Sequence, residues 1–269
     1  MAKVINPEPG QKGDVAGRTS TAPKATVPPK GRAQVVPPKD VRRAGFLTEL
    51  YRSALGKKYA MAISGVILMV YVLFHMIGNL KMYAGAEALD HYGEWLRIFG
   101  APAVPGGGLL WATRVVLLVA FGVHIHAAYG LTRMNQRARS VRYQSKRDYV
   151  AADFAARTMR WSGIIVLLFV LFHLADLTFG TANPSFEHGS VYNNVVASFS
   201  RWPVSLFYIV ANLALGLHLY HGAWSLFQSL GINNRRFNHW RRAFATGFAA
   251  IVVLGNVSFP IAVMTGIVA

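Results

Sequence analysis

Five long apolar runs constrain the fold of this chain more than any other feature. They cover residues 59–80, 109–131, 161–179, 204–226 and 243–268. About 20 apolar residues at a rise of ~1.5 Å each are enough to cross the ~30 Å hydrocarbon core of a bilayer. The composition agrees, because 53% of the residues are hydrophobic and only 14% are charged. The sequence therefore predicts an all-α, polytopic membrane protein with five transmembrane helices.

The distribution of basic residues predicts the orientation of these helices. Of the 28 Lys and Arg residues, 12 precede Tyr59, 8 lie between Arg133 and Arg160, and 4 lie between Arg235 and Arg242. Short cytoplasmic loops are the ones enriched in Lys and Arg. We therefore expect a cytoplasmic N-terminus and an external C-terminus. The net charge of +17 is therefore explained by basic loops that set the topology in a lipid bilayer. Nucleic acid is not expected as a partner.

The chain divides into a tail and a membrane domain. Residues 1–44 are basic and contain seven prolines with few apolar residues to bury, which predicts a disordered cytoplasmic extension. Residues 45–269 form the membrane domain, in which 45–58 is an amphipathic segment leading into the first span. Residues 86–100 are expected to form an interfacial helix on the outer face. No cleavable signal is visible, because the first apolar run is full-length.

Histidines inside the apolar runs carry the chemistry. Ionisable side chains at bilayer depth are costly and usually face the interior of a helix bundle. Six of the nine histidines lie there, namely His75, His124, His126, His173, His218 and His221. The chain has no cysteine, so it can hold neither thiolate-ligated iron–sulfur clusters nor thioether-linked haem. The arrangement looks like pairs of axial ligands for b-type haem, whereas a lone intramembrane histidine is often a buried residue hydrogen-bonded to a neighbouring helix.

Depth sorts the histidines into two pairs. The first and third spans run in the same direction, and at ~1.5 Å per residue His75 and His173 both lie roughly 23 Å above the inner end. The second and fourth spans run the opposite way, and His126 and His221 share the inner half. The sequence thus predicts a bundle with two bis-histidine haem sites, separated by roughly 15–20 Å of helix rise.

Two of these choices stay open on geometry alone. On a helix His124 lies about 200° from His126, so the two cannot face the same haem. His218 lies only about 60° from His221, so both can face the bundle. His124 and His218 are therefore alternative ligands or neighbours of the inner haem.

Several local patterns resemble one family, the cytochrome b membrane anchor of succinate:quinone oxidoreductases, in its five-helix, two-haem form. The patterns are KKYAMAISGVIL, FHMIGNLKMY, DHYGEWLR, HAAYGLTR and LHLYHGAWSLFQSLG, which lie in this order between Lys57 and Gly231. In that family small and aromatic residues and a basic end follow the second-span ligand, and glycine follows the fourth-span ligand. The resemblance therefore selects His126 and His221 for the inner haem.

The resemblance also implies the partners and the activity. A flavoprotein subunit with FAD and an iron–sulfur subunit would bind on the cytoplasmic face of a bacterial cell membrane, and an additional small membrane subunit is a further candidate partner. This chain would hold two haem b groups and pass electrons between the iron–sulfur subunit and a quinone, menaquinone by family association. No soluble-substrate chemistry is expected in this chain alone. Some fumarate reductases carry a glutamate two residues before the fourth-span ligand, where this chain has Leu219.

Polar residues near the expected haems are candidates for binding a quinone or a haem propionate. The quinone candidates are Glu94, Trp95 and Asp176 on the outer side and Ser64, Tyr129, Trp224, Ser225 and Gln228 on the inner side. Arg114 and Arg133 are the candidate partners of outer and inner propionates. The alternative for all of them is an ordinary helix-end residue wetted by water or headgroups.

Two other functions compete with this interpretation. The first is the cytochrome b subunit of another membrane oxidoreductase, such as a hydrogenase or a formate dehydrogenase. The second is a transporter that uses the histidines as a proton relay. The relay predicts acidic partners within the spans, and the apolar runs contain only Asp176 near one end.

Overall fold

The computed structural model describes residues 45–138, 154–232, 234, 236 and 238–269. The chain separates into two units, Met1–Arg43 and Ala44–Ala269, and the described residues all belong to the second. The prediction for the N-terminal extension lies outside the described residues.

The described residues form α-helices and one short 3₁₀ helix, with no strand among them. The elements are α1 (Phe46–Arg52), α2 (Ala54–Asn79), η1 (Leu80–Ala84), α3 (Ala86–Ile98), α4 (Gly108–Arg137), α5 (Phe154–Leu177), α6 (Val191–Phe199), α7 (Trp202–Ser229) and α8 (Asn238–Met264). Within the described ranges, five helices are long and apolar enough to cross a membrane, namely α2 continued by η1, α4, α5, α7 and α8. The predicted all-α architecture with five spans is therefore confirmed.

Most of these helices extend beyond the apolar runs that predict them. The first begins at Ala54, where the Ser53 side chain caps it by accepting a hydrogen bond from the backbone N–H of Gly56 at 2.9 Å. Ser53 is extended, so the amphipathic segment is split between α1 and the first turn of α2. The helix α4 continues to Arg137 because Thr132 to Arg137 is rich in residues that form helix readily. The apolar runs thus mark the membrane core rather than the full helices.

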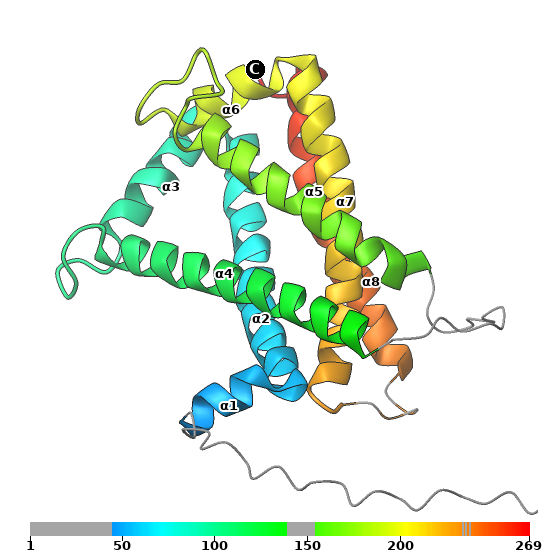
Figure 1. The fold of residues 1–269 in the computed structure, drawn as a ribbon. Coiled ribbons are helices and arrows are strands. Elements are labelled where there is room, and N and C mark those ends of the chain that lie inside the picture. The colour runs from blue at the N-terminus through cyan, green and yellow to red at the C-terminus, as the bar shows by residue number, and fades with distance from the viewer. Residues whose placement is uncertain (1–44, 139–153, 233, 235, 237) are drawn as a thin grey trace, which may run out of the picture. The chain divides into compact units, whose positions relative to one another are not determined.

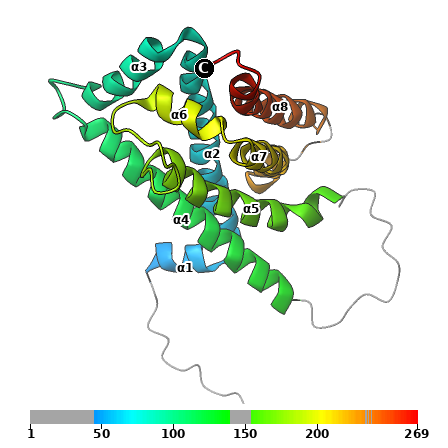
Figure 2. The same cartoon turned by 90° about the horizontal axis from the view of Figure 1, so that it is seen from above.

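Three helix pairings build the bundle. The helix α2 packs against α4, α5 packs against α7, and α7 packs along α8. In Figure 1, α2, α7 and α8 stand upright, whereas α4 and α5 cross them obliquely. The view from above shows the same crossing (Figure 2). Each of the two oblique helices therefore has one upright partner.

Short helices cover one end of the bundle. The predicted helix after the first span is present as α3, and α6 lies beside it at the end that also carries the C-terminus (Figure 1). The backbone N–H of Tyr192 at the start of α6 donates to Asp90 Oδ1 of α3 at 2.9 Å. The helix α6 is not expected from the apolar pattern of the sequence. Its nine residues are too few for an independent helix, so it depends on such contacts.

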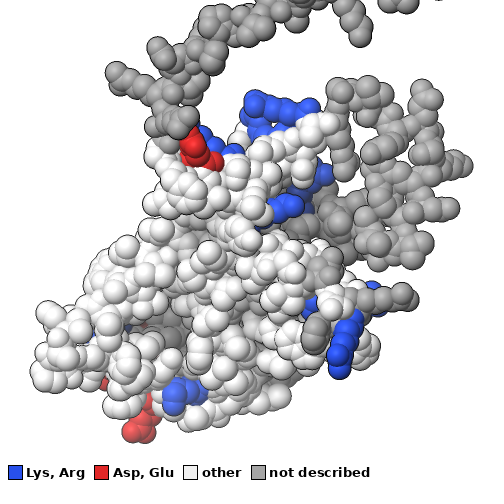
Figure 3. All heavy atoms as spheres, turned by 90° about the horizontal axis from the view of Figure 1, so that it is seen from below, with Lys and Arg blue, Asp and Glu red and all other residues white. Residues whose placement is uncertain are grey.

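The surface of the bundle is apolar. Leu118, Trp161 and Leu254 are each about 70% exposed, which suits contact with lipid rather than water. Figure 3 looks at the end that carries α1, and it shows separate groups of Lys and Arg on an otherwise largely uncharged face. Neither feature distinguishes the two sides of the membrane, so the orientation stays a prediction.

Candidate functional site

The first histidine pair lies between α2 and α5. The rings of His75 and His173 face each other with centroids 5.8 Å apart and planes at 82°. Tyr71 stacks on His75 at 5.4 Å, and Phe169 lies 5.8 Å from the His173 ring. The structure therefore brings together the two histidines that the depth argument pairs.

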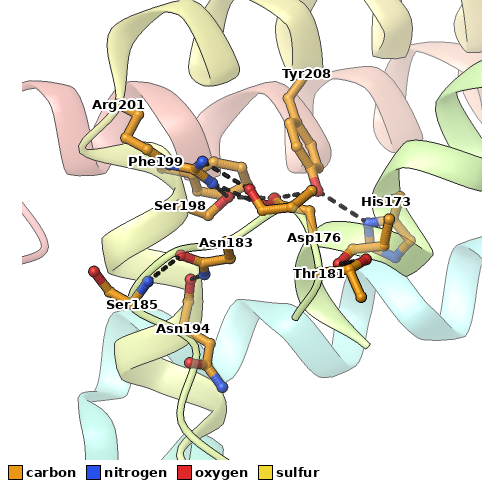
Figure 4. A network of polar contacts seen from close by, with 12 residues as sticks. His173, Asp176, Thr181, Asn183, Ser185, Asn194, Ser198, Phe199, Arg201 and Tyr208 are labelled. Atoms are coloured by element: carbon orange, nitrogen blue, oxygen red, sulfur yellow. Dashed lines mark hydrogen bonds and ion pairs between the residues drawn. The ribbon is translucent and has the colours of Figure 1, made fainter. Parts of the chain in front are cut away.

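A buried network holds one ring of this pair (Figure 4). The hydroxyl of Tyr208 lies 3.4 Å from Nδ1 of His173 and donates its own proton to Asp176 Oδ2 at 2.9 Å. Because the phenol proton is used in this way, its oxygen accepts from Nδ1–H of His173. The lone pair of the imidazole is then on Nε2, which is the atom free to bind a metal.

The second histidine pair lies between α4 and α7. The rings of His124 and His218 face each other with centroids 6.3 Å apart and planes at 64°. Ser64 Oγ lies 3.2 Å from Nδ1 of His124, and Ser162 Oγ lies 3.3 Å from Nδ1 of His218. Each imidazole of this pair therefore has a serine from the neighbouring helix.

These serines assign the same tautomer to both rings. Ser64 donates its proton to the carbonyl of Ala60 at 2.7 Å, and Ser162 donates to the carbonyl of Met159 at 3.0 Å. A hydroxyl has only one proton, so each serine oxygen accepts from the Nδ1–H of its histidine. Nε2 is again the atom with the lone pair. Three of the four paired histidines thus have the lone pair of the imidazole on Nε2.

Two glycines allow the second pair to approach the neighbouring helices. A Cβ added at Gly65 would lie 3.5 Å from Cε1 of His124, and one at Gly163 would lie 3.4 Å from Cε1 of His218. A larger side chain at either position would meet the ring. In each of α2 and α5, the serine therefore hydrogen-bonds a histidine ring and the following glycine leaves space for that ring.

These contacts expose an internal repeat that the sequence analysis missed. Residues 64–75 read SGVILMVYVLFH and residues 162–173 read SGIIVLLFVLFH, identical at seven of twelve positions. In each copy the serine contacts one histidine pair and the final histidine belongs to the other pair. Eleven residues of helix separate them, a rise of about 16 Å between the two pairs. Comparing the first span with the third would have found this signal.

The histidines that the resemblance selects have other neighbours. The Nδ1 of His126 lies 2.6 Å from the hydroxyl of Tyr51, and the two rings stack at 5.7 Å. His221 packs against the ring of Tyr220 at 4.9 Å. His124 and His126 lie about 200° apart on α4. Because His124 faces α7, His126 therefore points away from α7. The ring that faces His124 is His218.

Both pairs fit the axial ligands of a haem. A metal–imidazole bond is about 2 Å long and each ring centroid lies roughly 1 Å behind its nitrogen, so two axial imidazoles have centroids about 6 Å apart. The observed separations are 5.8 and 6.3 Å. Within the described ranges no group of three or more His, Cys, Asp or Glu residues could hold a metal ion. Two histidines on opposite sides are the protein ligands that a six-coordinate haem iron takes.

The outer quinone and propionate candidates are divided between two environments. Glu94 and Trp95 lie exposed on α3, where Trp95 contacts Phe99 at 4.6 Å. Asp176 is fully buried in the network with Tyr208. Arg114 is exposed, and its guanidinium lies 4.9 Å from the ring of Trp111 on its own helix.

The inner candidates also separate. Ser64 supports His124, as described above, and Ser225 donates to the carbonyl of His221 in its own helix at 2.7 Å. Gln228 is exposed near the end of α7. Arg133 donates to the hydroxyl of Tyr129 at 2.8 Å, and both side chains are exposed.

Trp224 lies in a basic setting at the same end of α7. Its ring is 4.8 Å from the guanidinium of Arg241 and 5.4 Å from that of Arg242. It lines a pocket of about 330 Å³ together with Asn238, His239 and Arg242. Trp224 is therefore an inner quinone candidate that lines a pocket.

Comparison with known proteins supports part of the resemblance. Residues 154–257 match the family described as succinate dehydrogenase/fumarate reductase transmembrane subunit. This match supports a membrane subunit of such an oxidoreductase. It covers 104 of 269 residues, including one histidine of each pair, His173 and His218. No curated protein and no solved structure matches the chain.

Proposed function

We propose that the chain is the membrane-anchor cytochrome b subunit of a succinate:quinone oxidoreductase, with two bis-histidine haem b sites. The observation that carries this proposal is the presence of two facing histidine pairs about 16 Å apart along the bundle. The family match over residues 154–257 supports the same complex.

The chain's own residues hold, orient and enclose the cofactors. His75 and His173 are the ligands of the outer haem, and the apolar spans exclude water from both sites. Haem b supplies one-electron transfer when bound. In the assembled complex the chain would connect an iron–sulfur subunit, with its flavoprotein partner, to a membrane quinone.

For the inner haem the geometry favours His124 and His218 over the sequence-based pair His126 and His221. The favoured rings face each other across the bundle at 6.3 Å, and each has its Nδ1 held by a serine. His126 instead makes a close hydrogen bond to Tyr51 of α1. We therefore assign His126 to the attachment of α1.

The experiment is a redox titration of the purified complex, followed by low-temperature absorption spectra. The parent should contain two b-type components. His75→Leu and His173→Leu should remove one component, and His124→Leu and His218→Leu should remove the other. His126→Leu and His221→Leu are the matched controls, since each removes a histidine from the same two helices, and both components should remain.

Two outcomes would contradict parts of the proposal. A parent complex without haem would exclude the cytochrome function. Loss of the inner component in His126→Leu and His221→Leu, with retention in His124→Leu and His218→Leu, would restore the sequence-based ligands. Either result is read directly from the spectra.

The partners separate this proposal from the related oxidoreductases. A flavoprotein and an iron–sulfur subunit should co-purify, and succinate should reduce the haems of the intact complex. A hydrogenase or formate dehydrogenase subunit in their place would indicate the alternative family. Menaquinone as the quinone, a bacterial cell membrane and a cytoplasmic N-terminus complete the proposal.

A further inference from the structure

The two histidine pairs differ in the groups that accept a hydrogen bond from Nδ1–H. His124 and His218 each donate Nδ1–H to a neutral serine. His173 donates instead to Tyr208, which is bonded to a carboxylate. This difference breaks the symmetry of the repeat, and it concerns one ligand of the outer site only.

The carboxylate behind His173 is fixed from several sides (Figure 4). Asp176 is fully buried and accepts from Arg201 at 2.7 Å, from Tyr208 at 2.9 Å and from Ser198. Arg201 is held in turn by the carbonyl of Ala182 at 2.9 Å. A carboxylate whose hydrogen bonds are all satisfied is held rigidly, so Asp176 keeps its position relative to Tyr208.

The first copy of the repeat has no equivalent of Asp176 beside His75. The position that matches Asp176 in the first copy is Gly78, which lies against the ring of Tyr92. Among the described residues, His75 makes a hydrogen-bond contact with the neutral side-chain amide of Asn79, whose Nδ2 lies 3.4 Å from Nε2. In this pair the acidic partner therefore stands behind His173 and not behind His75.

We propose that Tyr208 and Asp176 are positioning residues that fix the tautomer of His173 and lower the midpoint potential of the outer haem. The inference rests on the proposed function, because it takes His173 as an axial ligand. Donation of Nδ1–H toward a phenol that is itself bonded to a carboxylate increases the electron density and the basicity of the imidazole. A more basic ligand stabilises the ferric state, so the potential falls.

The same network removes Asp176 from the list of quinone ligands. Both of its oxygens accept hydrogen bonds from side chains of the chain itself, and none of its surface is exposed. Its role is therefore to act through Tyr208 on His173.

The test is a redox titration of Tyr208→Phe in the haem-loaded complex. Phenylalanine keeps the ring contacts of Tyr208 with Phe199 at 4.9 Å and Phe169 at 5.2 Å, so the bundle should stay folded. The midpoint potential of the outer component should rise and its electron paramagnetic resonance g values should shift, while the inner component is unchanged. Asp176→Asn should move the outer potential in the same direction by a smaller amount.

Two control variants make the result specific. Tyr192→Phe removes a phenol whose hydroxyl donates to the backbone carbonyl of Ala269, and it should change neither component. Ser162→Ala should raise the potential of the inner component alone, because it removes the acceptor of His218.

The outcomes separate this inference from the function on which it rests. An outer potential that is unchanged in Tyr208→Phe, with both haems present, would overturn the inference and leave the proposed function standing. A parent complex without haem would overturn both. A shift of both components in Tyr208→Phe would indicate a general structural change and would also overturn it.

Discussion

At the residue scale, the inner site includes two glycines at which a side chain larger than a methyl group would reach a histidine ring. Gly163 of α5 faces the His218 ring at ordinary contact distance, and Gly65 of α2 does the same for His124. The histidine rings therefore occupy space that a larger side chain at either glycine would fill. A test can therefore address the site without touching a ligand.

We expect Gly163→Leu to displace the ring of His218 and to abolish the inner haem component. A Cβ alone would lie 3.4 Å from the ring, so Gly163→Ala should keep the haem. The further carbons of leucine would extend beyond this contact and should displace the ring. The measurement is the haem content per chain and the number of components in a redox titration.

Gly122→Leu is the matched control for this substitution. Gly122 also lies inside a span, and a Cβ there would have no neighbour within 4 Å. Both components should survive in this variant. If Gly163→Leu also retained both, the placement of His218 against α5 would be wrong.

At the residue scale the sequence determines the depth of each histidine but not the direction in which it faces. Depth follows from counting along the spans, and it brings His75 together with His173, although their role as ligands stays a prediction. The choice between His124 and His126 depends on which side of α4 faces the bundle. That helix is apolar around its whole circumference over the span, so its sequence does not encode the face.

At the element scale, the length of the apolar runs predicts all five spans because the bilayer imposes a minimum length. The short helix α6 could not be predicted in this way. Its stability comes from tertiary contacts, including the burial of Ser198 and Phe199 and the bond from Tyr192 to α3. Short helices of this kind carry too little local signal.

The pairing of α7 with α8 gives a prediction at this scale. A Cβ at Gly216 would lie 2.2 Å from Cγ2 of Val253, whose β-branched side chain has little freedom to move. Gly216→Ala should therefore destabilise the protein by about 1–3 kcal/mol through overpacking. Thermal unfolding of the purified complex in detergent would measure the effect as a lower Tm.

Gly222→Ala serves as the control on the same helix. A Cβ at Gly222 has no neighbour within 4 Å, so the change should stabilise α7 by up to about 1 kcal/mol. An equal or higher Tm for Gly216→Ala would contradict the close contact between α7 and α8.

At the scale of the whole molecule, the basic residues predict which side of the membrane each end faces. A reporter fused after Ala269 should be active only outside the cell, and one placed before the first span only inside. The physical reason is the retention of Lys-rich and Arg-rich loops on the cytoplasmic side. A cytoplasmic signal from the C-terminal fusion would reverse the orientation, and with it the side on which the iron–sulfur partner binds.

The repeat of the Ser–Gly and Phe–His segment also bears on how such a molecule could arise. One helix pair, α2 with α4, contributes a histidine to each site, and the other, α5 with α7, contributes the second. Two copies of a single helix pair, related by an axis normal to the membrane, would generate both sites at once on that axis. An ancestor with one histidine at each depth would then have been inactive alone and complete as a dimer. Two copies within one chain need not be identical, and Asp176 at the position that matches Gly78 is a difference that a symmetric homodimer could not carry on one side alone.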